Sequence, residues 1–343
     1  MNRPIIIAEA GVNHNGSLET AVKMVRAAAA AGADYIKFQT FKTESLVTAA
    51  CEAAAYQKEN CNADSQTEML KKLELGFEDF RFLKEVCAKE GIGFLSTPFD
   101  RESILFLAAL KPDFMKVPSG EITNLPYLRE IAATNIPVII STGMSTLEDI
   151  WAALQPFKDA GYENEKIMLL HCTTQYPTPY EDVNLRVMTA LSKTFGLRTG
   201  YSDHTRGIEV PLAAAALGAA VIEKHFTLSR NMEGPDHKAS LEPDELCDMV
   251  QGIKNVAKAL GKDKKEVAAS ESANMIIARR SIVASRPIEK GEILSETNIT
   301  CKRPATGISP MYWDTMIGKK SPRRFLADEP FLSDDLESLT GNQ

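Results

Sequence analysis

The sequence predicts a (β/α)8 barrel followed by a small β-rich domain. Short β-branched runs alternate with helical patterns from residue 5 to residue 260, and a barrel of this kind usually takes about 250 residues. A doubly wound parallel sheet is the alternative, but no GxGxxG motif follows the first candidate strand. After Gly261 the pattern changes to short β-type segments separated by turn signals.

The eight strand candidates are identified by their β-branched and aromatic content. They are Ile5–Glu9, Tyr35–Thr40, Gly93–Thr97, Phe114–Pro118, Val138–Thr142, Ile167–Cys172, Arg198–Ser202 and Ala220–His225. The helices between them have recognisable starts and stops. Ser17 is placed to cap the first helix, which ends at Gly32, and Ser145 with Glu148 forms a capping-box pattern. The last helix of the series begins at Pro243.

A change of composition marks the domain boundaries. The segment GKDKKEVAAS, from residue 261, is charged and poor in large apolar residues, which is typical of a linker. We therefore expect a catalytic barrel over residues 1–262, a linker over 263–278 and a small domain over 279–343. A domain of about 65 residues has a small core, so we expect it to dock on a partner surface.

Charge and hydropathy exclude several classes of protein. The formal charge is −7, whereas non-specific nucleic-acid binding needs a basic face. An anionic ligand must therefore be held by a local cluster of side chains. The apolar run near the N-terminus is too short for a signal peptide or a membrane span. These observations predict a cytoplasmic protein with no nucleic-acid or membrane partner.

Polar side chains gather at one end of every predicted strand. Catalytic groups of a barrel lie at the C-terminal ends of its strands, and residues two apart on a strand share a face. The groups at or just beyond those ends are Glu9, Lys37, Gln39, Thr97, Lys116, Ser119, Glu121, Ser141, His171, Ser202, His204, Glu223 and His225. A structural protein has no reason to concentrate them there, so the pattern predicts an active site.

Two histidines are candidate metal ligands. His204 and His225 fall at the ends of adjacent strands, which can bring two imidazoles to one divalent cation. Carboxylates such as Glu9 or Glu121, or waters, would complete the shell. A lone strand histidine is usually a structural residue, but a neighbouring pair in polar sequence favours a metal. For His14 and His171, orienting roles and backbone hydrogen bonds both remain open.

Two lysines are candidate anion-binding residues. Lys37 and Lys116 project inward from parallel strands, and a buried lysine is costly unless it is paired with charge. Hydroxyl groups suited to phosphate and carboxylate oxygens accompany them: Thr97, Ser119, Ser141 and Ser202. Together they describe a site for a phosphorylated acid. Two alternatives remain: a Schiff-base lysine of an aldolase, or ion pairs with Glu9 or Glu121.

An ordered series of motifs resembles one family. The motifs are IIAEAGVNHNGS, IKFQTF, LSTPFD, KVPSGE, STGM, LHCTTQYPTP, GYSDHT, IEKHFTL, GPDHKASLEP and CKRP, from about residue 5 to about residue 335. They resemble bacterial N-acetylneuraminate (sialic acid) synthases and their relatives, the N,N'-diacetyllegionaminate synthases. The resemblance implies a barrel followed by an antifreeze-like (SAF) domain, a domain-swapped homodimer, and a requirement for Mn2+ or Mg2+. It also implies condensation of phosphoenolpyruvate with an N-acetylated mannose-type sugar, with release of phosphate.

The resemblance also assigns roles to single positions. His204 and His225 match metal ligands, and Glu9 and Glu121 match acidic residues beside the reacting centre. The positions that match phosphoenolpyruvate-binding groups are Lys37, Thr97, Lys116, Ser119, Ser141 and Ser202. Those that match sugar-binding groups are Gln39, Asn62, Tyr176, Asp236 and Arg303. Arg303 matches an arginine that the small domain inserts into the partner's barrel.

Other functions remain open at this stage. Phosphoenolpyruvate-dependent synthases of the 3-deoxy-ulosonic acid type are the nearest rivals, but they lack a C-terminal domain of this kind. A carbohydrate-binding protein without catalysis is the alternative from another class. The acceptor sugar is also open between N-acetylmannosamine and a 2,4-diacetamido-2,4,6-trideoxymannose. The segments GYSDHTRGI and GPDHKASLEP are at least as similar to legionaminate synthases as to neuraminate synthases.

Overall fold

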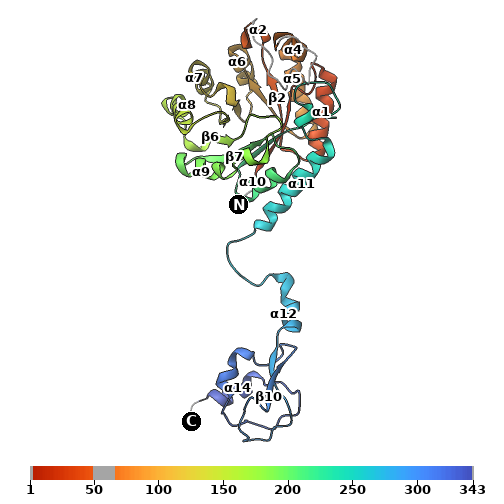
Figure 1. The fold of residues 1–343 in the computed structure, drawn as a ribbon, viewed down its shortest axis with the longest axis vertical. Helices are drawn as coiled ribbons and strands as arrows, with labels where there is room; N and C mark the ends of the chain where they lie inside the picture. Colours follow the sequence, from red (N-terminus) through yellow and green to blue (C-terminus); the bar gives the residue numbers. More distant parts are fainter. Residues whose placement is uncertain (1–2, 49–65, 342–343) are drawn as a thin grey trace. The chain divides into compact units, whose positions relative to one another are not determined.

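The computed structural model describes residues 3–48 and 66–341 and divides the chain into two compact units (Figure 1). The first unit is Met1–Gly261 and the second is Lys262–Gln343. Each unit has a hydrophobic core of its own, and the two cores share no residue. None of the helices in the described ranges combines the length and apolar character that crossing a bilayer requires.

The first unit is built on a parallel sheet of eight strands within the described residues. Their bounds are β1 Ile5–Gly11, β2 Tyr35–Thr40, β3 Gly93–Pro98, β4 Met115–Val117, β5 Val138–Ser141, β6 Ile167–His171, β7 Arg198–Asp203 and β8 Val221–His225. The order is β3-β2-β1-β8-β7-β6-β5-β4, and the two end strands β3 and β4 also lie beside each other. There the Tyr127 hydroxyl donates to the Pro98 carbonyl at 2.8 Å. The predicted (β/α)8 barrel is confirmed.

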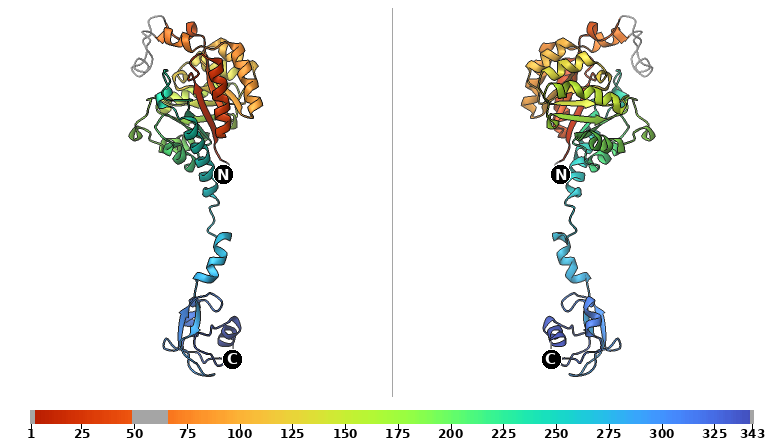
Figure 2. Two further views of the ribbon diagram at one scale, coloured as in Figure 1. Left: turned by 90° about the vertical axis from the view of Figure 1, so that its right-hand side faces the viewer. Right: turned by 90° about the vertical axis from the view of Figure 1, so that its left-hand side faces the viewer.

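Most helices cover the outside of this sheet (Figures 1 and 2), whereas the short helices Thr43–Leu46 and Gln66–Leu73 pack with Val12 and Phe41 just beyond the ends of β1 and β2. Their bounds are α1 Leu18–Ala31, α2 Thr43–Leu46, α4 Gln66–Leu73, α5 Phe77–Glu90, α6 Arg101–Ala109, α7 Leu125–Ala133, α8 Leu147–Asp159, α9 Arg186–Phe195, α10 Glu209–Ala216 and α11 Pro243–Leu260. The predicted ends of the first helix are confirmed. The Ser17 hydroxyl accepts from the Thr20 N–H, and Gly32 adopts the left-handed conformation with φ 80°.

The start of α8 differs from the sequence prediction by one residue. Its N-cap is Thr146, which forms a capping box with Asp149, so the predicted box of Ser145 and Glu148 is wrong. The Ser145 hydroxyl instead donates to the carbonyl of Gly143 at 3.0 Å. Two consecutive hydroxyl residues are each followed three positions later by a carboxylate, and the backbone geometry selects the second pair.

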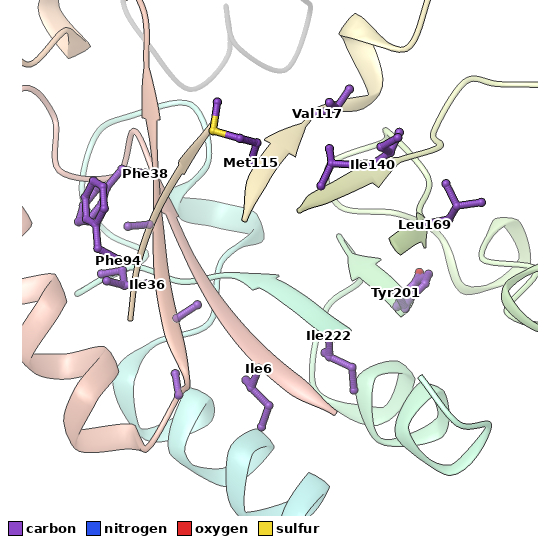
Figure 3. Close-up of a cluster of buried hydrophobic side chains, with 14 of the residues drawn as sticks. Ile6, Ile36, Phe38, Phe94, Met115, Val117, Ile140, Leu169, Tyr201 and Ile222 are labelled. Carbon is purple, nitrogen blue, oxygen red and sulfur yellow. The ribbon is translucent and has the colours of Figure 1, made fainter. Parts of the chain in front are cut away.

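Side chains alternate between two faces of the barrel wall. On the outer face, apolar residues from all eight strands pack toward the helices (Figure 3): Ile6, Ile36, Phe38, Phe94, Met115, Val117, Ile140, Leu169, Tyr201 and Ile222. A separate apolar cluster fills the barrel interior: Ile7, Leu95, Ile139, Met168, Leu170 and Val221. Because side chains repeat every two residues along a strand, the next inward positions toward the C-terminal end are mostly polar. This layer forms the site described below.

The second unit contains a two-stranded antiparallel sheet, β9 Ser281–Ala284 with β10 Ile299–Lys302. Isolated bridges extend the pairing, for example between Ile288 and Phe325. Its core centres on Phe325 and Phe331, whose ring centroids are 4.0 Å apart. Short helices α13 Trp313–Met316 and α14 Ser333–Thr340 complete the unit. The exposed N-terminal segment of this unit contains a short 3-10 helix and helix α12 Ser272–Ala278.

Candidate active site

A cavity of about 340 Å³ lies at the C-terminal ends of the barrel strands. Eleven of the fifteen residues that the sequence assigned to the site line it: Glu9, Lys37, Gln39, Thr97, Lys116, Ser119, Ser141, Tyr176, Ser202, His204 and His225. The cavity is also lined by Phe99, Pro118, Gly120, Met144, Cys172, Thr174 and Glu223. A larger hollow of about 710 Å³ lies at the other end of the strands, and its ionisable lining, among the residues that the structure describes, is Arg3 and Arg198.

Four of the fifteen residues do not line this cavity. Glu121 is on the 3-10 turn Ser119–Glu121, where its carboxylate accepts from the Asn124 amide at 2.7 Å. Asp236 lies just outside, with its carboxylate oxygen 3.9 Å from the His225 Nδ1 atom, and burial raises the pKa of Asp236 to about 6. Arg303 is an exposed residue of the second unit. Asn62 lies outside the described residues.

Two other histidines do not line the cavity: His171 lies on the outer face of β6, and His14 lies in the turn after β1. His171 pairs in register with Tyr201 on the outer face, and its Nε2 atom is 2.7 Å from the Val183 carbonyl. His14 accepts a hydrogen bond from the Gly16 N–H through Nδ1, at 3.1 Å. For both residues the structure therefore shows backbone hydrogen bonds, one of the two interpretations left open by the sequence.

Two lysines and two glutamates form a buried ionic network on the inner face. The Lys37 Nζ atom is 2.8 Å from a carboxylate oxygen of Glu9 and 3.7 Å from one of Glu223. The Lys116 Nζ atom is 3.6 Å from the other oxygen of Glu223. All four side chains are at most 6% exposed. Two buried ammonium groups thus share two carboxylates. An anionic ligand that enters the cavity can take the place of these carboxylates as the partner of the lysines.

Hydroxyl groups surround this network. Lys37 donates to Thr97 Oγ1 at 3.0 Å, and Lys116 donates to Ser141 Oγ at 2.8 Å. The Ser202 hydroxyl donates to Glu223 at 3.0 Å. Ser202 and Glu223 are register partners across β7 and β8. The two lysine contacts are diagonal, because Lys37 pairs with Leu95 and Lys116 pairs with Ile139, and each hydroxyl lies two residues further along the neighbouring strand. The hydroxyls of Thr97 and Ser141 can turn toward phosphate or carboxylate oxygens while they remain beside a lysine.

The two glutamates have opposite pKa shifts although they share Lys37. Burial is the largest influence on Glu9, and with the nearby charge of Glu223 it raises the pKa of Glu9 to about 7, against the opposing effect of Lys37. Burial also acts to raise the pKa of Glu223, but the ammonium groups of Lys116 and Lys37 outweigh it and hold that pKa at about 2. Near neutral pH, Glu223 is therefore a fixed anion and Glu9 can gain or lose a proton.

The sequence prediction gave no role to Glu223. It lies two residues before His225 on β8, so its inward orientation could be derived from the alternation alone. What the sequence could not supply was its distance to both lysines, because that depends on the closure of the barrel. Cys172 is a similar case. Its sulfur is 3.2 Å from the Ser119 hydroxyl, and burial raises its thiol pKa.

The rings of the two candidate metal ligands lie close together. The ring centroids of His204 and His225 are 5.4 Å apart, and the Tyr176 ring lies 4.1 Å and 5.7 Å from them. His204 Nδ1 is 2.6 Å from the Thr173 carbonyl. Because a carbonyl only accepts, Nδ1 carries the proton and Nε2 keeps its lone pair.

These histidines fit a divalent cation as part of its shell. Burial lowers the pKa of His204 and lowers that of His225 well below its usual value, so both rings are neutral, as metal ligation requires. Among residues 3–48 and 66–341, the buried Nδ1 atom of His225 finds no hydrogen-bond partner. In the parts of the chain that the structure describes, however, no group of three or more His, Cys, Asp or Glu side chains could hold a metal ion. Other ligands would have to complete the shell.

Comparison with known proteins identifies the family. The NeuB family profile matches residues 24–265, and the SAF domain profile matches residues 279–337. The chain belongs to the NeuB family. Two relatives of this NeuB-family member are N,N'-diacetyllegionaminic acid synthases. The one from Campylobacter jejuni is 50% identical over 96% of this chain and 99% of its own, and the one from Legionella pneumophila is 44% identical over 97% and 94%.

A solved structure supports the same assignment. The N-acetylneuraminic acid synthetase of Leptospira borgpetersenii, crystallised with citrate, is 36% identical to this NeuB-family member. The match has a TM-score of 0.71 and covers 80% of this chain and 90% of that one. Sequence motifs, barrel topology and solved structure therefore agree on the family and the fold.

Proposed function

We propose that this NeuB-family protein is a nonulosonic acid synthase that condenses phosphoenolpyruvate with an N-acetylated mannose-type sugar and releases phosphate. The observation that carries this proposal is the composition of the cavity. Two buried lysines, two neutral imidazoles and a carboxyl group with a pKa of about 7 converge on one site. Such a set can bind an anion, ligate a cation and move a proton.

The acceptor that we propose is a 2,4-diacetamido-2,4,6-trideoxymannose, which gives N,N'-diacetyllegionaminate. Identity supports this choice over N-acetylmannosamine. The two legionaminic acid synthases are 50% and 44% identical to this chain, compared with 36% for the N-acetylneuraminic acid synthetase. Gln39 and Tyr176 line the cavity, and with Asp236 beside His225 they would bind the sugar hydroxyl and amide groups.

Lys37 and Lys116 would hold phosphoenolpyruvate through its phosphate and carboxylate. The substrate oxygens would compete with Glu9 and Glu223 for the two ammonium groups, whose present contacts are between 2.8 and 3.7 Å. Thr97, Ser119, Ser141 and Ser202 would add hydroxyl donors. Since the site is buried, charge–charge stabilisation there is stronger than in water.

His204 and His225 would hold Mn2+ or Mg2+, and a cation bound there supplies Lewis-acid polarisation of the sugar aldehyde. The protein prepares the two rings for this role in different ways. The Thr173 carbonyl fixes the tautomer of His204, and burial keeps His225 neutral. Substrate oxygens or waters would provide the remaining ligands.

The chemistry that we propose forms one carbon–carbon bond. C3 of phosphoenolpyruvate attacks the aldehyde carbon, and the aldehyde oxygen takes up a proton. Water adds at C2 and loses one proton, which balances the proton taken up by the aldehyde oxygen. The C2–O bond to phosphate then breaks while the new C2 hydroxyl gives its proton to the departing phosphate, which leaves the 2-keto acid. Glu9 is our candidate for the group that takes the proton from water, because its pKa of about 7 suits general base catalysis at neutral pH. Glu121 remains the second candidate from the sequence.

We also propose that the chain works as a domain-swapped homodimer. Residues 263–278 would be the linker between the barrel, 1–262, and the SAF domain, 279–343. Arg303 of one subunit would then reach the acyl group of the sugar in the partner's barrel. The exposure of the Arg303 side chain in its own unit supports this role, because the core of that unit does not use it.

Phosphate release from phosphoenolpyruvate, measured with each candidate mannose derivative in turn, tests the proposed function. We expect turnover with the diacetamido sugar, its loss in EDTA, and recovery with Mn2+ in the wild type but not in His204→Ala or His225→Ala. Full turnover in chelator would remove the metal from the proposal. Sugar binding without phosphate release would favour a carbohydrate-binding protein, and borohydride trapping with pyruvate would favour a Schiff-base aldolase.

A further inference from the structure

A buried ion pair lies on the outer face of the barrel wall, beside the two histidines. Asp203 of β7 pairs with Lys224 of β8, and neither side chain is exposed. Each residue directly precedes a histidine of the site, His204 or His225. Both histidines line the cavity, whereas Asp203 and Lys224 follow the outward residues Tyr201 and Ile222 by two positions and so share their face. Neither member of the pair lines the cavity.

This pair continues the connection between the strands where the sheet pairing stops. The register of β7 with β8 ends at Asp203 opposite Lys224, so His204 lies beyond the last paired residue. Lys224 reaches past it and donates to the Thr205 carbonyl at 2.5 Å. Asp203 accepts from the Thr205 N–H at 3.1 Å and from its hydroxyl at 3.0 Å. Of the two residues that flank His204 in the chain, Asp203 therefore belongs to the pair and Thr205 is hydrogen-bonded to it.

We propose that the Asp203–Lys224 pair is a positioning device that sets the distance between His204 and His225 for a divalent cation. The inference rests on the metal role proposed above for the two histidines. Two imidazoles bind one cation tightly only if their separation is fixed before binding. Lys224 fixes it because its backbone adjoins His225 while its ammonium group holds Asp203 and Thr205 on either side of His204.

Stability alone does not explain an ion pair at this place. The cost of removing two charges from water commonly cancels their attraction, and a well-packed apolar pair is often as stable. An apolar pair could fill the same volume between strands and helices. It could not bond the Thr205 carbonyl, N–H and hydroxyl. Only the polar pair therefore supplies hydrogen bonds that hold the backbone on both sides of His204.

The test is Mn2+ affinity, measured by electron paramagnetic resonance titration of the full-length protein without substrates. We expect Lys224→Met to lower that affinity by roughly 10- to 100-fold, the usual effect of losing a group that orients a metal ligand. Lys224→Met alone leaves Asp203 buried and unpaired. The double variant Asp203→Leu/Lys224→Met removes both charges, is expected to fold, and should show the same loss of affinity.

Ser96→Ala is the matched control. Ser96 and Thr40 share a buried hydrogen bond of 2.7 Å between the neighbouring strands β2 and β3, also on the outer face. Its loss should leave Mn2+ affinity unchanged. The visible spectrum of the Co2+-substituted protein gives a second readout, and we expect it to change in the double variant and not in Ser96→Ala.

Two results would overturn the inference, and they are distinguishable. A folded double variant with wild-type Mn2+ affinity and Co2+ spectrum would show that the pair does not position the histidines. That result would leave the proposed function intact, provided that wild-type affinity is lost in His204→Ala. Equal Mn2+ binding by the wild type and His204→Ala would instead refute the metal role itself, and the positioning role with it.

Discussion

At the scale of single residues, charge and burial divide similar side chains into different roles. Glu9 and Glu223 both lie against Lys37, yet one has a pKa of about 7 and the other of about 2. The sequence could predict that Glu9, Lys37 and Lys116 point inward, because strand alternation determines it. It could not predict the orientation of Glu121, which lies on a turn outside the alternation.

The pKa of Glu9 leads to a prediction about pH. The folded-state pKa is raised from 4.5 to about 7, so the basic form of Glu9 accumulates only as the pH rises through about 7. If Glu9 is the base, kcat/KM rises over that interval. Glu9→Gln should lower kcat by roughly 100-fold or more and abolish this rise. Glu121→Gln serves as the comparison, and a rise that survives in Glu9→Gln would exclude Glu9 as the base.

The lysines give a prediction about substrate binding. Lys116→Met should raise the KM for phosphoenolpyruvate about 10- to 100-fold, because a hydrogen bond to a charged group contributes about 1.5–3 kcal/mol. The KM for the sugar should change little. Steady-state kinetics with each substrate varied separately measures both. The exposed Lys158→Met is the control for a loss of charge outside the site. Unchanged kinetics in Lys116→Met would remove that lysine from the anion site.

At the scale of strands and helices, the sequence was informative where the pattern was periodic. The predicted bounds of β2 are the observed ones, and those of β1 and β4 differ by at most two residues at either end. The cap of α8 was misplaced because neighbouring residues carry the same pattern. The sequence pattern predicted the barrel, but it could not predict the side-chain contacts that support its closure between β3 and β4. One of them is the hydrogen bond from the Tyr127 hydroxyl to the Pro98 carbonyl, whose two residues are remote in sequence.

The closure of the barrel therefore carries its own prediction. Tyr127→Phe removes the donor to the buried Pro98 carbonyl and should cost about 1–3 kcal/mol in the free energy of unfolding. Because β3 and β4 carry Thr97 and Lys116, the KM for phosphoenolpyruvate should rise as well. Urea unfolding and kinetics measure the two effects. Tyr162→Phe, which loses a similar bond to the Ile136 carbonyl, should leave that KM unchanged.

At the scale of the whole molecule, the sequence predicted two parts from a change in composition. The structure divides the chain at Gly261, and each part has its own core. The barrel and SAF families were foreseen from the motifs, and the family profiles confirm them. A second subunit could not be predicted in the same way. The composition of one chain contains no direct signal for a homodimer, so the domain swap stays a proposal.

Subunit mixing tests the proposed role of Arg303. Arg303→Ala and His204→Ala homodimers should both be inactive. Co-expressed mixed dimers should regain part of the wild-type activity, up to about half, because one of their two sites combines an intact barrel with an intact arginine. Phosphate release by purified, differently tagged mixed dimers provides the measurement. Verified mixed dimers without activity, formed from folded subunits, would mean that the arginine acts in its own chain or has no role.

The two separate cores also affect how heat unfolds this protein. A two-state analysis assumes that all parts of a chain melt together, and a chain with independent cores does not satisfy it. The core around Phe38 and the core around Phe325 share no side chain, so calorimetric data should be fitted with two transitions as well as with one. Two resolved transitions would mean that the barrel and the SAF domain melt separately, and the stability effect of Tyr127→Phe would then be taken from the barrel transition. One shared transition would mean that the unfolding of the two parts is coupled, as a domain-swapped dimer requires.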